Sequence, residues 1–260
     1  MMENNKEYWI KRAELKQLLT EKNIKKIERE LKKNYKEAIK EIKKELTYLK
    51  ATNELAEWQK IQLEGTINSI NEILNDMATK EEKLLTDTLE ELCQQVDEKD
   101  KKALEVQLDA LFHKVNSELI EEVVKTNWSG LMFSERIWNR RDKLAIKLKE
   151  ILNKGLIRGD SLQDMARLLA DEMNKDFNSA MRLVHTETAN VQVQTSLQRY
   201  KEAGLDTYEY LECPNKDCCP HCKKLAGQVF KIEEAQVGVN CPPLHPRCHC
   251  DIMPPPTVSE

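Results

Sequence analysis

The sequence predicts a mainly α protein, in which a long helical body is followed by a small α+β module at the C-terminal end. Charged residues make up 33% of the chain, only seven glycines and eight prolines occur, and the prolines are concentrated after residue 213. A body rich in Glu, Lys, Leu and Ile with so few breakers is typical of long helices. By contrast, seven of the eight cysteines and three of the five histidines lie between Cys213 and Cys250. The two parts therefore differ in the chemistry that they support.

The charge is unevenly distributed along the chain. The formal net charge is −4, yet the first 50 residues hold 15 Lys and Arg against 9 acidic residues. This balance argues against a uniformly basic nucleic-acid binder. The basic N-terminal stretch either contacts DNA or an acidic partner surface, or is the solvated face of a helix with interleaved Glu and Lys.

The N-terminus lacks the apolar region of a signal peptide, and no stretch has the length that a membrane span requires. We therefore expect a soluble protein that is made in the cytoplasm and has no membrane contact. In a reducing compartment, clustered cysteines favour metal binding over disulfides.

Residues 1–125 are predicted to form an elongated helical arm. Over residues 6–50 we expect a short helix as far as Leu19 and a second one beginning near Ile24, with Gly65 as a possible break further on. Apolar residues of the second helix recur at steps of three and four, so they form one stripe that packs against another helix or a partner protein. Single residues expected to be buried in this segment are Trp58, Cys93 and His113.

Residues 126–204 are predicted to form a second, helical domain. Asn127–Gly130 breaks the helical pattern, Ser134 is a candidate cap for the next helix, and Gly155 and Gly159 mark its end. Asp160 or Ser161 then caps a helix, with Gln163 or Asp164 at the capping-box position. The last helix is expected from about Asn178 to Ala203 and ends at Gly204.

On this last helix Arg182, His185, Thr186 and Glu187 form a polar cluster among apolar neighbours. Such a set can be interpreted as a catalytic group, but nothing nearby supplies a nucleophile or a phosphate cradle. We therefore favour buried polar contacts between domains.

Residues 205–260 are predicted to form the small module. Tyr208–Leu211 alternates as a strand does, and residues 229–230 and 248–252 also indicate short strands. Cys219 and Cys222 have the two-residue spacing of a zinc knuckle, and about twenty residues later His245, Cys248 and Cys250 supply further donors. If Cys248 and Cys250 lie in a strand, their side chains point to the same face.

The predicted metal ligands are thus Cys219, Cys222, His245 and one of Cys248 or Cys250, around a structural Zn²⁺. The neighbouring Cys213, Cys218 and Cys241 leave the choice open, since Cys213 or Cys218 could replace a member. A closed four-ligand site has no open position for water, so no hydrolysis is expected. Redox-labile or disulfide-bonded cysteines and a catalytic metal are the alternatives.

The module resembles the C-terminal signature of the phage head morphogenesis proteins, the minor head or minor capsid group that includes the Mu F-like proteins. The resemblance also takes in residues 133–138 and Tyr8, Trp9 and Arg12 near the N-terminus, so it spans nearly the whole chain. His249, where the family usually has Arg, departs from the pattern and adds another possible ligand, and Cys213, Cys218 and Cys241 are extra. Positions that match the signature are Asp217, Cys219, Cys222, Leu225, Gly227, Phe230, Pro242, Pro243, His245, Pro246, Cys248 and Cys250, with Arg182, Thr186 and Glu187 upstream.

This resemblance implies a non-enzymatic virion component that is assembled in the bacterial cytoplasm and lies at the portal vertex inside the head. Its implied partners are the portal protein, other capsid or scaffold proteins and, through the basic N-terminal stretch, packaged DNA, with roles in head morphogenesis and DNA packaging or ejection. Some relatives carry a toxin or transferase domain after the signature, which we do not expect in the ten residues that follow Cys250 here. The alternative is a zinc-ribbon nucleic-acid-binding protein, although the stretch between Cys222 and His245 is poor in Arg.

Overall fold

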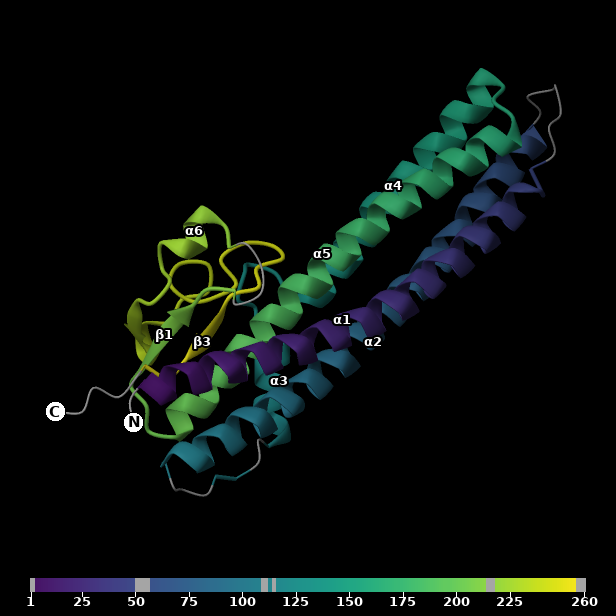
Figure 1. The fold of residues 1–260 in the computed structure, drawn as a ribbon. Coiled ribbons are helices and arrows are strands. Elements are labelled where there is room, and N and C mark those ends of the chain that lie inside the picture. Colours follow the sequence, from purple (N-terminus) through teal and green to yellow (C-terminus); the bar gives the residue numbers. More distant parts are fainter. Residues whose placement is uncertain (1–2, 50–56, 109–111, 114–115, 214–217, 256–260) are drawn as a thin grey trace. The chain divides into compact units, whose positions relative to one another are not determined.

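The computed structural model describes residues 3–49, 57–108, 112–113, 116–213 and 218–255, and within these no side chains of residues 3–5 and 57–60. It confirms the predicted fold class, because long helices are followed by a small strand-containing, cysteine-rich module (Figure 1). The elements are α1 (Glu3–Leu46), α2 (Glu57–Leu108), α3 (Ser117–Lys125), α4 (Phe133–Arg158), α5 (Leu162–Glu202), β1 (Thr207–Leu211), α6 (Pro220–Lys223), β2 (Val229–Lys231), the 3-10 turn η1 (Ile232–Glu234) and β3 (Asp251–Met253).

The helices are longer than predicted. The two helices expected over residues 6–50 form one helix, α1, because no Gly or Pro interrupts the backbone hydrogen bonds between Leu19 and Ile24. Gly65 lies inside α2 rather than at a break, since a lone glycine costs only about 1 kcal/mol in a helix. The two helices expected before and after Asn178 likewise form the single helix α5.

The predicted helix ends are correct where a glycine has a positive φ angle or a side chain caps the helix. Residues 126–132 are not helical, and Gly130, Gly159 and Gly204 have positive φ angles of 90°, 73° and 75°, which glycine adopts without a Cβ clash. The backbone N–H of Asp164 donates to Ser161 Oγ at 3.1 Å, which confirms Ser161 as the cap of α5.

Two predicted ends are wrong. Ser134 lies inside α4, which begins at Phe133, and Gly155 also lies within that helix. The positive φ angle at Gly159, not the presence of Gly155, stops the helix, because a helical glycine can keep ordinary helical angles.

The chain divides into two compact units. Unit 1 comprises Met1–Lys26, Thr86–Met132 and Arg182–Glu260, and unit 2 comprises Ile27–Leu85 and Phe133–Met181. Helices α1, α2 and α5 each contribute residues to both units. The division predicted from sequence, at residues 125 and 204, follows chain order instead and stays a prediction.

Unit 2 consists of helical segments that bury the apolar stripe of α1. Leu31, Tyr35, Ala38, Ile42 and Leu46 are each at most 4% exposed, as expected for the stripe at steps of three and four. The stripe therefore packs within the chain.

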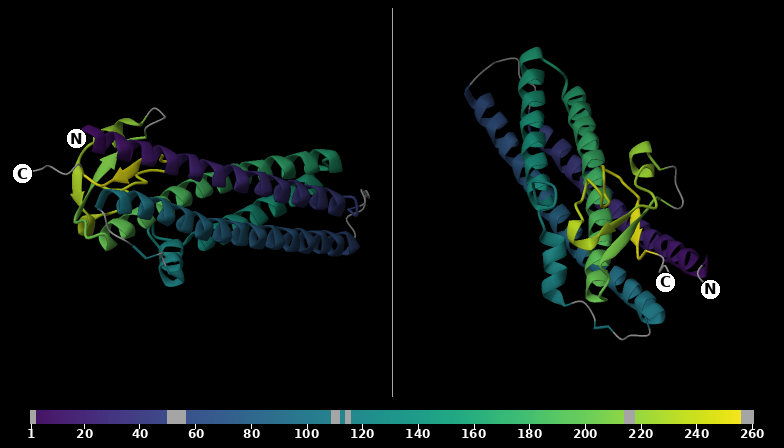
Figure 2. Two further views of the ribbon diagram at one scale, coloured as in Figure 1. Left: turned by 60° about the horizontal axis from the view of Figure 1, so that its bottom comes forward. Right: turned by 90° about the vertical axis from the view of Figure 1, so that its left-hand side faces the viewer.

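Unit 1 holds the small sheet. Its strand order is β2-β1-β3, both pairs are antiparallel, and Tyr210 of β1 lies opposite Ile252 of β3. The sheet lies beside the start of α1 and the end of α5 (Figures 1 and 2), where its side chains share a core with Trp9 and Tyr200. This packing fixes β3, and hence the cysteines before it, against the helices.

The strand predicted over residues 248–252 is partly wrong. Only Asp251–Met253 forms β3, and Cys248, His249 and Cys250 lie in the irregular segment before it. Cys248 and Cys250 therefore do not share a strand face.

A buried ion cluster anchors β3 in unit 1. Lys16 of α1 lies 3.4 Å from Asp100 of α2 and 3.3 Å from Asp251 of β3, with all three side chains at most 3% exposed. Ser196 of α5 donates to Asp100 at 2.5 Å and accepts from Lys16 at 2.9 Å. Four elements are thus joined at the residue that follows Cys250.

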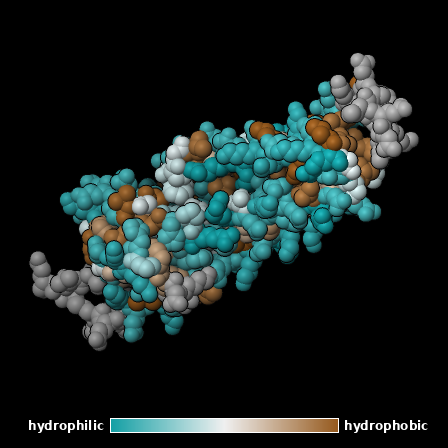
Figure 3. Space-filling view, turned by 90° about the horizontal axis from the view of Figure 1, so that it is seen from above, coloured by the Kyte–Doolittle hydropathy of each residue, from teal (hydrophilic) through white to brown (hydrophobic). Residues whose placement is uncertain are grey.

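The surface is mostly hydrophilic. On the face that Figure 3 shows, polar and charged residues predominate, and apolar residues form separate patches. No described helix combines the length and apolar character needed to cross a bilayer.

Candidate metal centre

Helix α6 positions the first two predicted ligands. Cys219 is its N-cap residue, and Pro220 follows in the first turn, where its missing N–H is not needed. The backbone N–H of Cys222 donates to Cys219 Sγ at 3.4 Å. The C-x-x-C spacing thus brings two sulfur atoms to one end of a short helix, with backbone N–H groups directed at one of them.

His245 approaches both sulfur atoms through the same ring nitrogen. Its Nε2 lies 3.4 Å from Cys219 Sγ and 3.4 Å from Cys222 Sγ. Its Nδ1 lies 3.0 Å from the carbonyl oxygen of Pro246, to which it must donate. That hydrogen bond places the proton on Nδ1 and leaves the Nε2 lone pair directed at the sulfurs, as in metal-binding histidines.

Cys248 lies next to this group and is a candidate for a fourth donor. Its Sγ lies 3.9 Å from Cys222 Sγ. Bond lengths of about 2.3 Å to sulfur and about 2.0–2.1 Å to nitrogen give a tetrahedral zinc site donor–donor separations of about 3.5–3.8 Å. The three separations from His245 and Cys222 lie close to that range. The donor atoms of Cys219, Cys222 and His245 lie within 4.8 Å of one another, and Cys248 adjoins this group through Cys222.

Cys250, also predicted as a ligand, lies in an adjoining group. The sulfur atoms of Cys218, Cys222 and Cys250 all lie within 4.8 Å of one another, and so do the donor atoms of Cys219, Cys222 and His245. Cys250 Sγ is 3.4 Å from Cys218 Sγ. The structure thus gathers all five predicted ligands together with Cys218, and a cluster of this composition can hold a metal ion.

Hydrogen bonds favour the thiolate form of two of the cysteines, which is the form that binds a metal ion. Hydrogen bonding from the backbone N–H of Cys222 lowers the pKa of Cys219. The neighbouring Cys250 thiol, followed by backbone hydrogen bonds, lowers the pKa of Cys248 against the opposing effect of burial. Burial instead raises the pKa of Cys222 to about 12, so its thiolate requires a cation beside it.

Tyr210 is a residue of the site that sequence reasoning missed. Its hydroxyl is buried without a hydrogen-bond partner, and burial together with the sulfurs of Cys250 and Cys222 raises its pKa. A buried hydroxyl beside metal-bound thiolates can donate to one of them, which supports the fit to a cation. The alternation of Tyr208–Leu211 placed Tyr210 in a strand, but only the pairing of β1 shows which face meets the cysteines.

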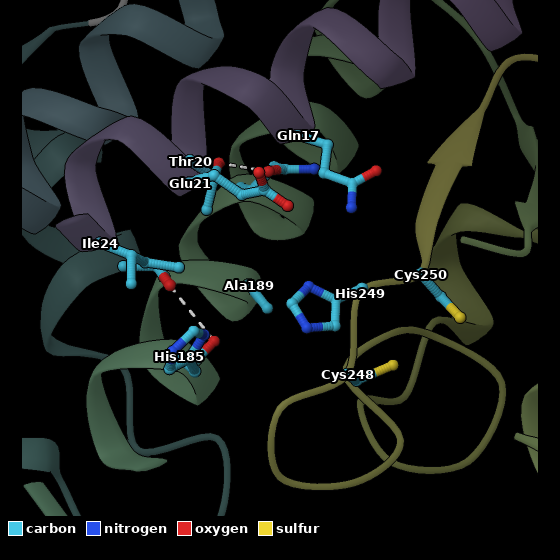
Figure 4. A pocket seen from close by; sticks show the side chains of 11 residues that line it. Gln17, Thr20, Glu21, Ile24, His185, Ala189, Cys248, His249 and Cys250 are labelled. Carbon is cyan, nitrogen blue, oxygen red and sulfur yellow. Dashed lines mark hydrogen bonds between the residues drawn. The ribbon is translucent and has the colours of Figure 1, made fainter. Parts of the chain in front are cut away.

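Three other candidates lie outside the cluster. Cys213 accepts a hydrogen bond from Gln17 at 3.6 Å, and Cys241 lies in the apolar core of unit 1, where burial raises its pKa to about 12. The His249 ring extends from the opposite side of the chain to the sulfurs of Cys248 and Cys250 (Figure 4). It lines a pocket of about 20 Å³ with residues of α1 and α5, and its centroid lies 6.1 Å from that of His185. The possible ligand role of His249 thus lacks support from the geometry.

The polar cluster on α5 makes structural contacts within unit 1. Glu187, 5% exposed, accepts a hydrogen bond from the indole N–H of Trp128 at 3.0 Å. Thr186 Oγ1 donates to the carbonyl oxygen of Arg182 at 2.8 Å and accepts from the backbone N–H of Arg247 at 3.4 Å. The contact with Arg247 holds the loop between His245 and Cys248 against α5. These are polar packing contacts within unit 1, and the predicted role between domains stays a prediction.

Comparisons with known proteins identify the segment that carries the site. Residues 146–253 match the family described as Phage Mu protein F like protein, which confirms the resemblance from the middle of α4 to the end of β3. An NAD(+)--arginine ADP-ribosyltransferase EFV of Enterococcus faecalis is 29% identical over 89 residues, which cover 34% of this chain and 18% of that protein. The match thus spans less than a fifth of that relative's length. No solved structure matches the chain.

Proposed function

We propose that this chain, whose residues 146–253 are phage Mu F-like, is a structural phage head protein that docks on the portal and acts in head morphogenesis and in DNA packaging or ejection. The observation that carries the proposal is the family match, because it includes both α5 and the entire cysteine cluster. The family implies a location in the virion.

In this proposal the cluster holds a structural Zn²⁺ through Cys219, Cys222, His245 and Cys248. When bound, zinc supplies a tetrahedral cross-link with no open position for water. The chain's own residues orient it: the carbonyl of Pro246 fixes the His245 tautomer, and the turn of α6 fixes the two sulfurs. Elemental analysis should find one zinc per chain, and a chain purified without any metal would refute this role.

We further propose that the chain has no enzymatic activity. Glu187 is held by Trp128, and a four-ligand zinc leaves no reactive position. The relative named as an ADP-ribosyltransferase matches over too small a part of its length to carry its activity to this chain. Incubation with NAD+ and a free arginine substrate should give no transfer. Transfer that is lost in Glu187→Gln with the fold intact would contradict the proposal.

A basic face on α1 supports a contact with packaged DNA. In unit 2, Arg29, Lys32, Lys33, Lys36 and Lys40 line a surface hollow of about 420 Å³ together with Glu37. The four lysines are exposed and lie at helical spacings of one face. Such a row of cations attracts a phosphate backbone without sequence specificity.

The zinc-ribbon alternative assigns DNA binding to the module instead, where Lys223, Lys224 and Lys231 are exposed. Two triple variants distinguish DNA binding by α1 from DNA binding by the module. The first replaces Lys32, Lys36 and Lys40 by Gln, and the second replaces the three module lysines by Gln. If the proposal is right, only the first variant binds duplex DNA more weakly. In that variant the logarithm of the binding constant should also depend less steeply on the logarithm of the salt concentration. A loss confined to the second variant favours the zinc ribbon.

Portal docking is tested with procapsids assembled from the same phage genome. We expect a tagged chain to recover the portal protein, and its gene deletion to leave the capsid shell formed but the particles less infectious. Portal-containing procapsids that lack this chain would contradict docking, whatever the outcome of the metal and DNA measurements.

A further inference from the structure

We propose that Cys218 and Cys250 form a dithiol–disulfide couple beside the metal-binding set of Cys219, Cys222, His245 and Cys248. The proposal rests on the metal site proposed above and is independent of portal docking. It assigns a redox modification to two cysteines that a single tetrahedral ion leaves over.

The cluster holds six donors, two more than one structural zinc takes. The proposed set consists of Cys219, Cys222 and His245, whose donor atoms lie within 4.8 Å of one another, and Cys248, whose Sγ is 3.9 Å from Cys222 Sγ. One Zn²⁺ takes four ligands in a structural site, so it cannot also engage Cys218 and Cys250 without releasing two of these. Two thiols are therefore left over at the edge of the centre.

The two remaining sulfur atoms lie in contact with each other. The sulfur atoms of Cys218 and Cys250 are 3.4 Å apart, whereas a disulfide bond measures about 2.03–2.05 Å. Closing the bond thus requires the two sulfurs to approach by roughly 1.4 Å. Side-chain rotation at Cys218, which precedes the N-cap of α6, is a local movement that leaves β3 in place.

The two thiols differ in their exposure to a small oxidant. Cys250 is 4% exposed, but Cys218 is only partly buried, so a small oxidant meets Cys218 first. Cys219 is also only partly buried, but the proposal assigns it to the metal, whereas Cys222 is fully buried and Cys241 is enclosed in the apolar core. Exposure thus selects Cys218 as the attacking residue and Cys250 as the residue that resolves the intermediate.

The oxidant is a low-molecular-weight disulfide. The Cys218 thiolate attacks one sulfur of that disulfide, which forms a mixed disulfide and releases the other half as a thiol. The Cys250 thiolate then attacks Cys218 Sγ, which forms the Cys218–Cys250 bond and releases the second half. Two protein thiols are oxidised, one small disulfide is reduced to two thiols, and the protons of Cys218 and Cys250 end on the released thiols.

The bond would join the residue before the N-cap of α6 to the residue before β3, which are 32 positions apart in the sequence. It would therefore retain the fold of the loop even when the metal is lost. A reducing environment opens the pair and an oxidising one closes it, with the metal ligands unchanged in both states.

The test uses the full-length, zinc-loaded protein and oxidised glutathione. We expect tandem mass spectrometry of non-reduced digests to find the Cys218–Cys250 cross-link, with two thiols consumed and one zinc retained per chain. The matched variants are the neighbours Cys218→Ser and Cys219→Ser. The first should abolish the cross-link and keep the zinc, and the second should lose the zinc.

Three results would overturn the inference. They are the absence of a cross-link in the wild type, a cross-link that involves Cys219, Cys222 or Cys248 in the zinc-loaded protein, and zinc loss in Cys218→Ser, which would make Cys218 a ligand. Zinc absent from the wild type refutes the metal site itself, and the portal experiment is unaffected by any of these outcomes. Circular dichroism of both variants separates a failure to fold from a loss of chemistry.

Discussion

Buried charges in unit 2 join side chains that lie far apart in the sequence. Arg140 donates to both carboxylate oxygens of Glu81, at 2.6 and 2.5 Å, and to Asp176 at 3.1 Å. Tyr35 also donates to Asp176, at 2.6 Å. Burial opposes the charge on Arg140, but the neighbouring carboxylates outweigh it and raise its pKa. A single guanidinium thus pairs with two carboxylates among packed helices.

Replacing Arg140 by Met should therefore be costly. It leaves Glu81 and Asp176, with side chains 1% and 8% exposed, without their cation. We expect the free energy of unfolding to fall by about 3–5 kcal/mol, measured by urea denaturation. The control Lys143→Met removes an exposed cation from the same helix and should change it by less than about 0.5 kcal/mol. Equal effects of the two substitutions would contradict the buried network.

Cys93 should be inert in the folded protein. It is 0% exposed, and burial raises the pKa of its thiol, so little reactive thiolate is available. Alkylation at pH 8 followed by peptide mass spectrometry should label Cys218 in the native state and Cys93 only after unfolding. Rapid labelling of native Cys93 would show that unit 1 opens there.

At the scale of the elements, glycine geometry decides where the long helices stop. Gly159 ends α4 with a φ angle of 73°, whereas Gly65 lies within α2 and a Cβ added there meets no atom within 4 Å. The same residue type therefore ends one helix and is merely tolerated in the other. The difference lies in the backbone φ angle, which cannot be read from the residue type alone.

The two glycines make a matched pair of substitutions in unit 2. Gly159→Ala forces a Cβ into the left-handed region and should lower the free energy of unfolding by about 1–2 kcal/mol. Gly65→Ala should raise it by about 0.5–1 kcal/mol, since alanine loses less backbone entropy in a helix. Urea denaturation of both variants measures the difference, and effects of the same sign would refute this assignment.

At the scale of the whole molecule, the Mu F-like segment is distributed over both compact units. Residues 146–181 of the matched segment lie in unit 2 and residues 182–253 lie in unit 1. The candidate metal ligands all lie in unit 1, together with the first turns of α1 and the end of α2. A cross-link at the metal centre should therefore stabilise one unit selectively.

Metal removal tests this selectivity. After a strong chelator is added, hydrogen exchange should accelerate at least tenfold in β1 and β3, because a site that binds only the folded state stabilises that state. Exchange in α1 from Ile27 to Leu46 should change less than twofold, since unit 2 holds no candidate ligand of the centre. Mass spectrometry of peptides resolves the two regions. A uniform acceleration over both would contradict a local role of the metal.

Much of the local structure could be predicted from the sequence. Helical periodicity placed the buried stripe of α1, Ser161 and Gly204 gave correct helix ends, and the alternation at Tyr208–Leu211 gave β1. The spacing of Cys219 and Cys222 and the later His245 and Cys248 indicated donors that the structure brings together. The helix, cap, strand and C-x-x-C predictions succeed because they depend on neighbours within a few positions, where covalent geometry fixes which side chains meet.

Only the tertiary structure decided which donors face one another. The sequence offered Cys248 and Cys250 as equivalent ligands. In the structure both precede β3, and Cys250 contacts Cys218. The ring of His249 lines a pocket with residues of α1 and α5. Tyr210 and the Lys16–Asp100–Asp251 cluster likewise join segments that are far apart in the chain. The sequence by itself determined the helical character of the body, the cysteine spacing and the family resemblance. Packing of β1 and β3 against α1 and α5 selected the partners, because side-chain direction in an irregular segment follows from tertiary contacts and from no local repeat.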